Sequence, residues 1–190
     1  MNLSQVKHVA LGAVLLAALI LALFAASAQS TQAATANLVV NGSFEKDVNG
    51  NNIPDGWLPF FLDPGDKRVC NQSKAGACSF RLAGDSGVKY IWQQIAQGGL
   101  ASDDFNLSAW MKGKDIVNGG GVARVMVEFI HTAGGSNFNY VTLTASMPWT
   151  FFTQPVLPTA NYDAIVVTVR LDDITSGKVW FDKVKLVPAP

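Results

Sequence analysis

Charged side chains, histidine, cysteine and glutamate are all scarce in this chain, and each shortage argues against a class of function. Only 15% of the 190 residues are charged, and 14 basic residues balance 14 acidic ones. This composition predicts no basic patch for nucleic acid and no polybasic segment for anionic lipid. With two histidines and two cysteines, a zinc centre built from these side chains is not expected.

Catalytic motifs are also lacking. The only glutamates are Glu45 and Glu128, and no aspartates form an obvious pair, whereas a glycosidase needs two carboxyl groups at a set separation. The chain has no Gly-x-Ser-x-Gly elbow and no phosphate-binding loop. Gly84–Gly87 reads Gly-Asp-Ser-Gly, as in serine proteases, but we interpret it as a turn because a triad partner is lacking. We therefore expect no enzyme, and a small glycan-active hydrolase is the least favoured hypothesis.

The N-terminal segment has the pattern of a secretory signal peptide. Lys7 precedes an apolar run over residues 9–26, and Ala26-Ser27-Ala28 is a small-residue cleavage site. We expect residues 1–28 to be removed and residues 29–36 to form a flexible leader. An uncleaved anchor is the alternative, because the run has about 18 residues, the lower limit for a membrane span. After cleavage we expect a secreted or cell-surface monomer with no membrane or nucleic-acid partner.

Cys70 and Cys78 both lie in the part of the chain that would be exported. Two cysteines in an oxidising compartment usually form a disulfide, although two free thiols are the alternative. Because the spacer is short, the bridge would pin a surface hairpin rather than connect distant parts of the fold.

Alternating apolar and polar residues predict an all-β protein. In Asp104–Lys112, Val122–Ile130 and Ala164–Leu171, apolar side chains recur at every second position, as in half-buried strands. Further strands are expected at Asn37–Val40, Trp57–Leu62, Lys67–Cys70, Cys78–Ala83, Tyr90–Ala96, Tyr140–Ala145, Phe151–Leu157 and Val179–Val187. Many short strands separated by glycine-rich turns, with no amphipathic helix, indicate a β-sandwich or a barrel.

Several motifs resemble one known group of proteins. The segments NLVVNGSFE at Asn37–Glu45 and VWFDKVKL at Val179–Leu186 resemble the two ends of carbohydrate-binding-module-like, galactose-binding-like jelly rolls. Between them, motifs of the same family follow in order: SFRLAG at 79–84, WQQI at 92–95, FNLSAWMKG at 105–113 and WTFFTQPV at 149–156. The resemblance implies a two-sheet antiparallel β-sandwich of jelly-roll type over residues 37–188, with 189–190 as a tail. Such folds host sugar binding, adhesion and other roles.

The resemblance also implies a structural calcium ion where the first and last strands meet. Glu45 and Asp182 would supply carboxylate oxygens, which calcium prefers. Lys183 stands where the family often has a second acid. The alternative is that Glu45 and Asp182 cap strand ends in solvent.

A second candidate calcium site is the segment DVNGNNIPD, residues 47–55, which resembles the calcium loops of thrombospondin-type and dockerin-type repeats. The ligands would be the side chains of Asp47, Asn49, Asn51 and Asp55 and the carbonyl of Ile53. Asn52 and Leu58 depart from the usual pattern, which predicts weak binding at most. The alternative is a polar turn held by its own side chains.

Carbohydrate recognition uses aromatic rings that stack on sugars and planar polar groups that bind hydroxyls. If the predicted strands are neighbours, their outward side chains form one patch. The candidate ligand-binding residues are Trp92, Gln94, Trp110, Arg124, Glu128 and Arg170. The alternatives are that the tryptophans fill space under loops and that the charged residues pair with each other. We expect a secreted, non-catalytic module that binds an extracellular glycan or polysaccharide, or else a structural or adhesive surface module without sugar binding.

Overall fold

The computed structural model describes residues 36–117 and 119–189, where all regular structure is β-strand. The predicted signal peptide and residues 29–35 of the predicted leader lie outside these ranges. The strands are β1 (Leu58–Phe60), β2 (Lys67–Val69), β3 (Ser79–Ala83), β4 (Lys89–Ile95), β5 (Phe105–Val117), β6 (Val122–His131), β7 (Ser136–Leu143), β8 (Met147–Val156), β9 (Tyr162–Asp172) and β10 (Ser176–Pro188). In the described ranges, no helix is long and apolar enough to cross a membrane.

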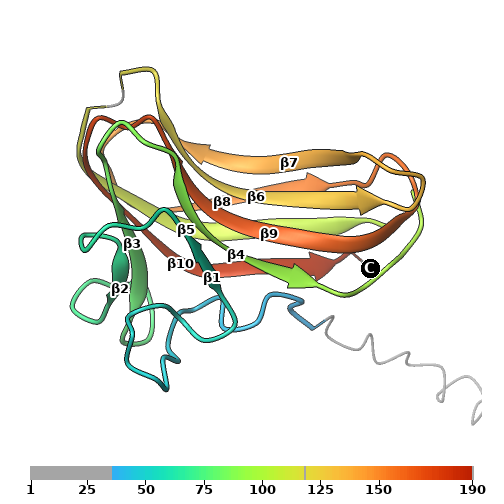
Figure 1. Cartoon of the computed structure of the whole chain (residues 1–190), viewed down its shortest axis with the longest axis horizontal. Coiled ribbons are helices and arrows are strands. Elements are labelled where there is room, and N and C mark those ends of the chain that lie inside the picture. Colours follow the sequence, from blue (N-terminus) through green and yellow to red (C-terminus); the bar gives the residue numbers. More distant parts are fainter. Residues whose placement is uncertain (1–35, 118, 190) are drawn as a thin grey trace, which may run out of the picture. The chain divides into compact units, whose positions relative to one another are not determined.

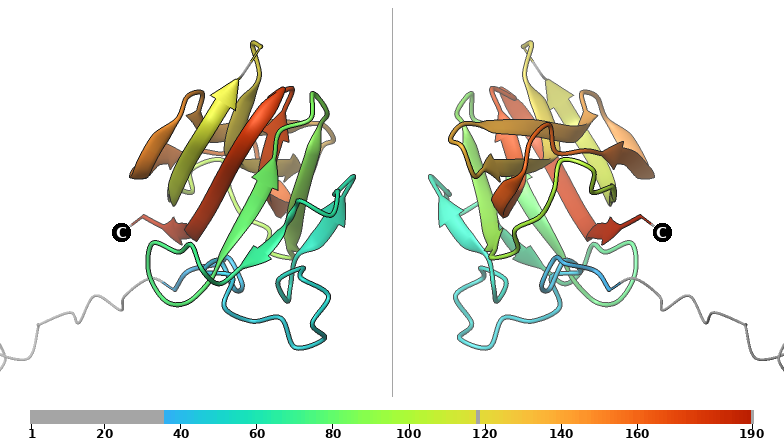
Figure 2. Two further views of the ribbon diagram at one scale, coloured as in Figure 1. Left: turned by 90° about the vertical axis from the view of Figure 1, so that its left-hand side faces the viewer. Right: turned by 90° about the vertical axis from the view of Figure 1, so that its right-hand side faces the viewer.

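The strands form two five-stranded antiparallel sheets packed face to face (Figures 1 and 2). Sheet A has the order β1-β4-β9-β6-β7, and sheet B has the order β2-β3-β10-β5-β8. Sequence neighbours such as β4 and β5, or β9 and β10, lie in different sheets. This confirms the predicted β-sandwich of jelly-roll type.

The core lies between the two sheets. Successive side chains of a strand point to opposite faces, so each strand contributes every second residue to the core. On β6, for example, Ala123, Val125, Val127 and Phe129 are fully buried. Burial of each valine or phenylalanine side chain of this kind stabilises the fold by roughly 1.5–3 kcal/mol. The alternate residues lie on the outer faces, where they are free to form sites.

Ten of the predicted strands are present with shifted ends, but the strand predicted at Asn37–Val40 is wrong. The side chain of Asn37 takes the place of a strand partner: its Oδ1 accepts from Leu186 N at 2.9 Å. The backbone of the segment contributes one bond to β10, from Leu38 N to Leu186 O at 2.9 Å. The chain then turns through the left-handed conformation at Asn41 and Phe44.

The two ends of the domain nevertheless lie together, as the resemblance implied. Val184 N donates to Gly42 O at 2.8 Å. The approach is so close that a Cβ at Gly42 would lie 2.1 Å from Val184 O, so only glycine fits here.

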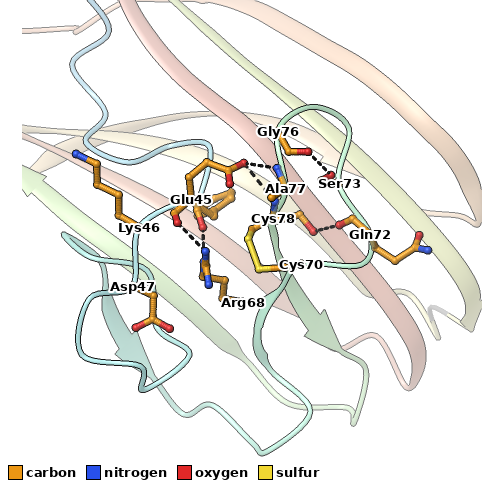
Figure 3. Close-up of a disulfide and its surroundings, with 12 residues drawn as sticks. Glu45, Lys46, Asp47, Arg68, Cys70, Gln72, Ser73, Gly76, Ala77 and Cys78 are labelled. Carbon is orange, nitrogen blue, oxygen red and sulfur yellow. Dashed lines mark hydrogen bonds between the residues drawn. A yellow bond between two sulfur atoms is a disulfide. The ribbon is translucent and has the colours of Figure 1, made fainter.

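The predicted disulfide is confirmed: Cys70 and Cys78 are joined, with a sulfur–sulfur distance of 2.08 Å. The bridge closes the loop between β2 and β3 (Figure 3). The pairing holds this loop in place beside Glu45, whose side chain contacts it directly.

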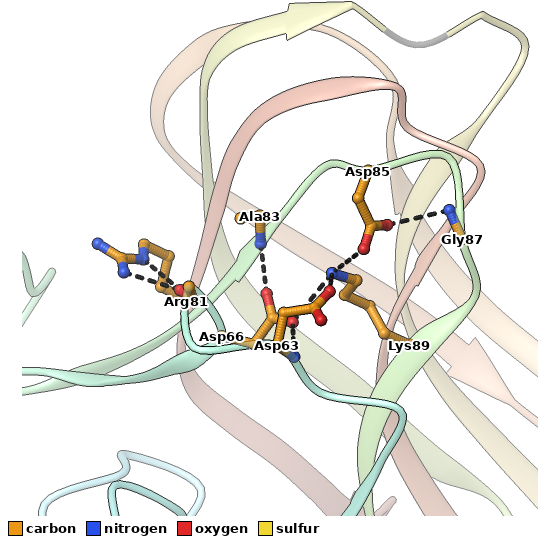
Figure 4. A network of polar contacts seen from close by, with 8 residues as sticks. Asp63, Asp66, Arg81, Ala83, Asp85, Gly87 and Lys89 are labelled. Carbon is orange, nitrogen blue, oxygen red and sulfur yellow. Dashed lines mark hydrogen bonds and ion pairs between the residues drawn. The ribbon is translucent and has the colours of Figure 1, made fainter.

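A buried lysine joins two connections, the one between β1 and β2 and the one between β3 and β4 (Figure 4). The Nζ atom of Lys89 lies 2.6 Å from an Asp85 oxygen, 2.9 Å from Asp63 and 3.0 Å from Asp66. The side chain of Lys89 is only 2% exposed. Burial alone would lower its pKa, but the hydrogen bonds to the three carboxylates outweigh burial and raise it. Sequence reasoning did not predict this cluster.

Candidate binding face on sheet A

The outer face of sheet A brings polar and aromatic side chains into rows across its strands. The antiparallel register defines a central row: Trp92 on β4, Thr168 on β9, Met126 on β6 and Tyr140 on β7. Flanking rows contain Gln94, Val166, Glu128 and Phe138 on one side and Tyr90, Arg170, Arg124 and Thr142 on the other. Five of the six predicted ligand-binding residues therefore share one face.

These rows enclose a cavity of about 310 Å³. It is lined by Tyr90, Trp92, Met126, Glu128, Phe138, Val166, Thr168 and Arg170. The lining mixes flat rings, apolar side chains and hydrogen-bonding groups, as small-molecule and sugar sites do.

Two arginines beside the cavity are held in place by one carboxylate. Arg170 Nε donates to Asp172 Oδ1 at 2.5 Å, and Arg124 Nη1 lies 3.7 Å from Asp172 Oδ2. Each guanidinium also lies over a ring, Arg124 at 4.9 Å from Tyr140 and Arg170 at 5.6 Å from Tyr90. Such contacts restrict both side chains before any ligand arrives.

Hydrogen-bonding capacity is left over in this group. Arg124 Nε and Asp172 Oδ2 are buried without a hydrogen-bond partner in the part of the chain that the structure describes. Buried polar atoms normally have partners, so unmet capacity beside a cavity points to a polar ligand or ordered water.

Charge on this face is balanced. Arg124 and Arg170 are matched by Glu128 and Asp172, all on β6 and β9. A balanced face does not attract a strongly charged ligand and suits a neutral one.

Exposed aromatic rings stand on both edges of the face. On β7, Phe138 is 52% exposed and Tyr140 is 45% exposed. On the β1 side, Phe60 stacks on Tyr90 with ring centroids 4.4 Å apart, and Phe61 is 76% exposed. Sequence reasoning missed Phe60, Phe61 and Phe138. The alternating Phe-Asn-Tyr of residues 138–140 was the available signal for β7, but the predicted strand began only at Tyr140.

The expectation that Trp110 joins Trp92 is wrong. Trp110 lies on β5 of sheet B, opposite Asp182 of β10 and Phe151 of β8, so it faces the other side of the sandwich. Its ring contacts Phe151 at 5.4 Å, and Lys74 Nζ lies 4.0 Å from its centroid. Period-two patterning shows which residues of a strand share a face, but it does not show which sheet the strand enters.

Several cations also gather in one place on sheet B, although the net charge of the chain is zero. Arg81, Lys112, Lys114 and Lys178 line one cavity on the outer face of sheet B. Strands β3, β5 and β10 are adjacent in this sheet, which brings together cations that are far apart in the sequence.

At the predicted calcium junction, the carboxylates of Glu45 (Figure 3) and of Asp182 already bind backbone amides. Asp182 Oδ2 accepts from Lys74 N at 2.8 Å and Ala75 N at 3.0 Å, and Oδ1 accepts from Lys183 N at 2.7 Å. Glu45 Oε1 accepts from Ala77 N at 3.0 Å. These groups are proton donors rather than the oxygen ligands that calcium needs. The amides therefore occupy part of the accepting capacity that a calcium ion would need at this junction.

The electrostatics of the junction follow from the same geometry. Burial raises the pKa of Asp182, the amides of Ala75, Lys74 and Lys183 counter this in part, and the charge of Glu45 raises it again. The net effect is a raised pKa.

The predicted calcium loop, residues 47–55, is partly held by its own side chains. Asn49 Oδ1 accepts from Asn51 N at 3.0 Å, and Asn51 Oδ1 accepts from Ile53 N at 2.8 Å. Both oxygens of Asp55 accept from Val48 N. Asp47 Oδ1, however, is buried with no hydrogen-bond partner among the described residues. A carboxylate oxygen without a partner makes this loop a better candidate for a cation than the Glu45–Asp182 junction. The described ranges contain no group of three or more His, Cys, Asp or Glu side chains that could hold a metal ion.

No protein-family model and no curated protein matches the sequence. Solved structures do match the fold. A "Family 16 Carbohydrate Binding Module-2" is 23% identical with a TM-score of 0.63, and the match covers 80% of this chain and 99% of that one. The structure of TmCBM61 in complex with β-1,4-galactotriose is 15% identical with a TM-score of 0.57, covering 82% and 100%.

A third match is the CBM22-1 xylan-binding domain from Paenibacillus barcinonensis Xyn10C, 14% identical with a TM-score of 0.52, covering 82% of this chain and 96% of that one. At these identities the comparison concerns the fold, and it confirms the resemblance predicted from the sequence motifs at that level. The chain therefore has the jelly-roll fold of carbohydrate-binding modules.

Proposed function

We propose that this chain is an exported, non-catalytic module that binds a neutral polysaccharide or glycan chain across the outer face of sheet A. The observation that carries the proposal is the cavity of about 310 Å³ between two exposed aromatic edges on a face with balanced charge. The shared fold with carbohydrate-binding modules supports it.

In this proposal, the rings of Trp92, Phe138 and Tyr140 stack on the apolar faces of sugar rings. Gln94, Glu128 and Thr168 lie in the same or adjacent rows and would hydrogen-bond hydroxyl groups. Because sugar chains expose both kinds of surface along their length, a face with alternating rings and polar groups is complementary to them.

The absence of catalysis is supported by the carboxyl groups of the face. The cavity lining in the described residues contains one carboxyl group, that of Glu128. Asp172, the nearby acid, is engaged by Arg170 at 2.5 Å. A glycosidase needs two carboxyl groups, one free to act as acid and one as base or nucleophile.

Export is supported by two independent features. The N-terminal residues have the pattern of a signal peptide. The Cys70–Cys78 disulfide is of the kind that persists in oxidising compartments.

Calcium belongs to the proposal only at the loop of residues 47–55, where Asp47 Oδ1 lacks a partner. An ion there would supply charge neutralisation and hold the loop. Because a ligand that binds only the native state raises the unfolding midpoint, calcium should raise it in the wild type. Asp47→Asn should abolish the rise and Asp182→Asn should leave it. The absence of a rise, or its loss only in Asp182→Asn, would overturn the assignment.

The test of sugar binding is isothermal titration and affinity electrophoresis against neutral polysaccharides, beginning with β-1,4-galactan and xylan because two structural neighbours are described with such ligands. Trp92→Ala should weaken binding at least about tenfold, as for a central aromatic contact. Trp110→Ala is the matched control, since it removes an equivalent ring from the opposite face. Binding to no neutral glycan, or equal losses in the two variants, would contradict the proposal.

A further inference from the structure

We propose a second, anion-specific site on the outer face of sheet B, which takes a carboxylate or sulfate group of an acidic polysaccharide. The proposal rests on a cavity of about 580 Å³ on the side of the sandwich opposite the aromatic face of sheet A. The choice of a polysaccharide as carrier rests on the proposed function, but the recognition of an anion rests on the geometry below.

The cavity gathers positive charge. Arg81, Lys112, Lys114 and Lys178 line it, and its lining contains one acid, Asp115. Lys114 and Asp115 approach each other only to 4.0 Å, with side chains 66% and 80% exposed, so their pairing is weak. The lining therefore keeps a positive excess in a chain whose overall charge is close to zero.

The strand register places like charges directly opposite each other. Lys178 on β10 faces Lys114 on β5 across the ladder. Like charges at directly opposed positions destabilise a sheet unless a counter-charge lies between them. An anion bound above this pair would supply that counter-charge.

The floor of the cavity carries an unsatisfied donor. Trp180 lies between Arg81 and Lys112 in the register and is only 5% exposed. Its Nε1 is buried with no hydrogen-bond partner in the described part of the chain. A buried indole N–H normally has an acceptor, so this donor is consistent with a ligand that brings an oxygen.

Lys112 lies over the indole ring at the floor. Its Nζ lies 5.4 Å from the Trp180 ring centroid and donates to Gln72 Oε1 at 2.7 Å. Gln72 is exposed on the disulfide-closed loop. This hydrogen bond is exposed, so water and ligands compete for both groups. Lys112 can therefore exchange Gln72 for an incoming anion and uncover the indole. Arg81, in contrast, is fixed by two hydrogen bonds to Gly65 O at 2.9 and 2.7 Å.

The test is titration of the wild type with a galacturonate hexamer, its methyl-esterified counterpart and a sulfated galactan, at about 0.15 M salt, where exposed charges are screened beyond about 8 Å. We expect the acidic probes to bind and the esterified hexamer not to bind at this site. Carboxylate-only or sulfate-only binding would support the site and identify its natural group. Binding of neither acidic probe would overturn the proposal.

Variants locate the binding. Lys114→Gln/Lys178→Gln should weaken acidic-probe binding by about tenfold, the sum expected from two exposed ionic contacts. Lys46→Gln/Lys185→Gln removes the same charge from exposed lysines outside the cavity lining and should change affinity less than about twofold. Equal losses in both double variants would show diffuse attraction and overturn the site. Trp180→Phe, which keeps most of the packing but removes the N–H, should also weaken binding.

The two sites can be separated experimentally. Trp92→Ala should weaken neutral-glycan binding at least about tenfold without affecting the acidic probes, because Trp92 lies on sheet A. If neutral binding fails in every protein while the acidic probes still bind in a Lys114- and Lys178-dependent manner, the anion site stands and the proposed function of sheet A falls.

Discussion

Replacing Lys89 by methionine should destabilise the domain more than the same replacement at any other lysine. The substitution keeps most of the aliphatic stem but removes the ammonium group that three carboxylates contact within 3.0 Å. Asp66, whose side chain is fully buried, would lose its counter-charge. Its oxygens would keep only backbone donors: Ala83 N donates to Oδ1 at 2.7 Å, and Asp63 N donates to Oδ2 at 2.8 Å.

The expected magnitude follows from leaving buried charges unpaired. Removing one partner of a buried ion pair costs about 3–5 kcal/mol. In a domain of this size, roughly 1 kcal/mol shifts the unfolding midpoint by 2–4 °C, so the midpoint should fall by about 10 °C. Lys114→Met, at a side chain 66% exposed, is the matched control and should change stability by less than about 0.5 kcal/mol.

The effect should depend on pH in a defined direction. The pKa of Lys89 is raised in the folded state, so its contribution is full below the unfolded value of 10.5 and is lost as the pH rises through the folded value. Burial opposes ionisation of Asp85, but its hydrogen bonds to Lys89 and Asp63 lower its pKa overall. Its contribution is therefore full above the unfolded value of 3.8 and is lost as the pH falls through the folded value.

The assay is urea unfolding of the wild type and both variants, followed by circular dichroism between acidic and alkaline pH. The stability difference between wild type and Lys89→Met should form a plateau near neutral pH and shrink in acid, as the pH falls through the lowered pKa of Asp85. A difference below about 1 kcal/mol at neutral pH, or one that grows in acid, would refute the reasoning.

Three further predictions concern the disulfide, the close contact between Gly42 and Val184, and the contacts of Asp172 with Arg124 and Arg170. Cys70→Ser/Cys78→Ser should lower the free energy of unfolding by about 2.5 kcal/mol, the loop-entropy value for a sequence separation of 8. A reductant should lower the stability of the wild type only. An unchanged urea midpoint in the double variant would contradict this prediction. Gly42→Ala should cost about 1–3 kcal/mol because its Cβ would lie 2.1 Å from Val184 O. Gly65→Ala, with its nearest contact at 3.3 Å, should cost less in the same assay. Asp172→Asn should weaken neutral-glycan binding several-fold in the titration, because it releases the side chains of Arg124 and Arg170. An unchanged affinity would show that Asp172 does not contribute to binding through these arginines.

The fold was largely predictable because strand periodicity is a local signal. The alternation in residues 122–130 and 164–171 identified β6 and β9 and the faces they bury. The strand predicted at Asn37–Val40 is wrong although its apolar pair, Val39 and Val40, is compatible with a strand. The side-chain oxygen of Asn37 accepts from Leu186 N and Val39 N, in place of the backbone hydrogen bonds of a strand.

The site was predictable only in part because it depends on sheet order. Trp92 and Arg170 were correctly predicted to share a face because their strands, β4 and β9, are neighbours in sheet A. Trp110 followed the same pattern but belongs to the other sheet. The Lys89 cluster and the cations around Trp180 join residues from separate segments, so no local pattern could reveal them.

The most direct test of the central claim is nuclear magnetic resonance of the indole N–H signals during titration with neutral glycans. The chain has five tryptophans, and each signal can be assigned by single Trp→Phe replacement. We predict that a bound galactan or xylan oligosaccharide shifts the Trp92 signal and leaves the Trp110 signal in place. A shift of Trp110 without Trp92, or no shift with any neutral glycan, would contradict the assignment of the outer face of sheet A as a carbohydrate-binding surface.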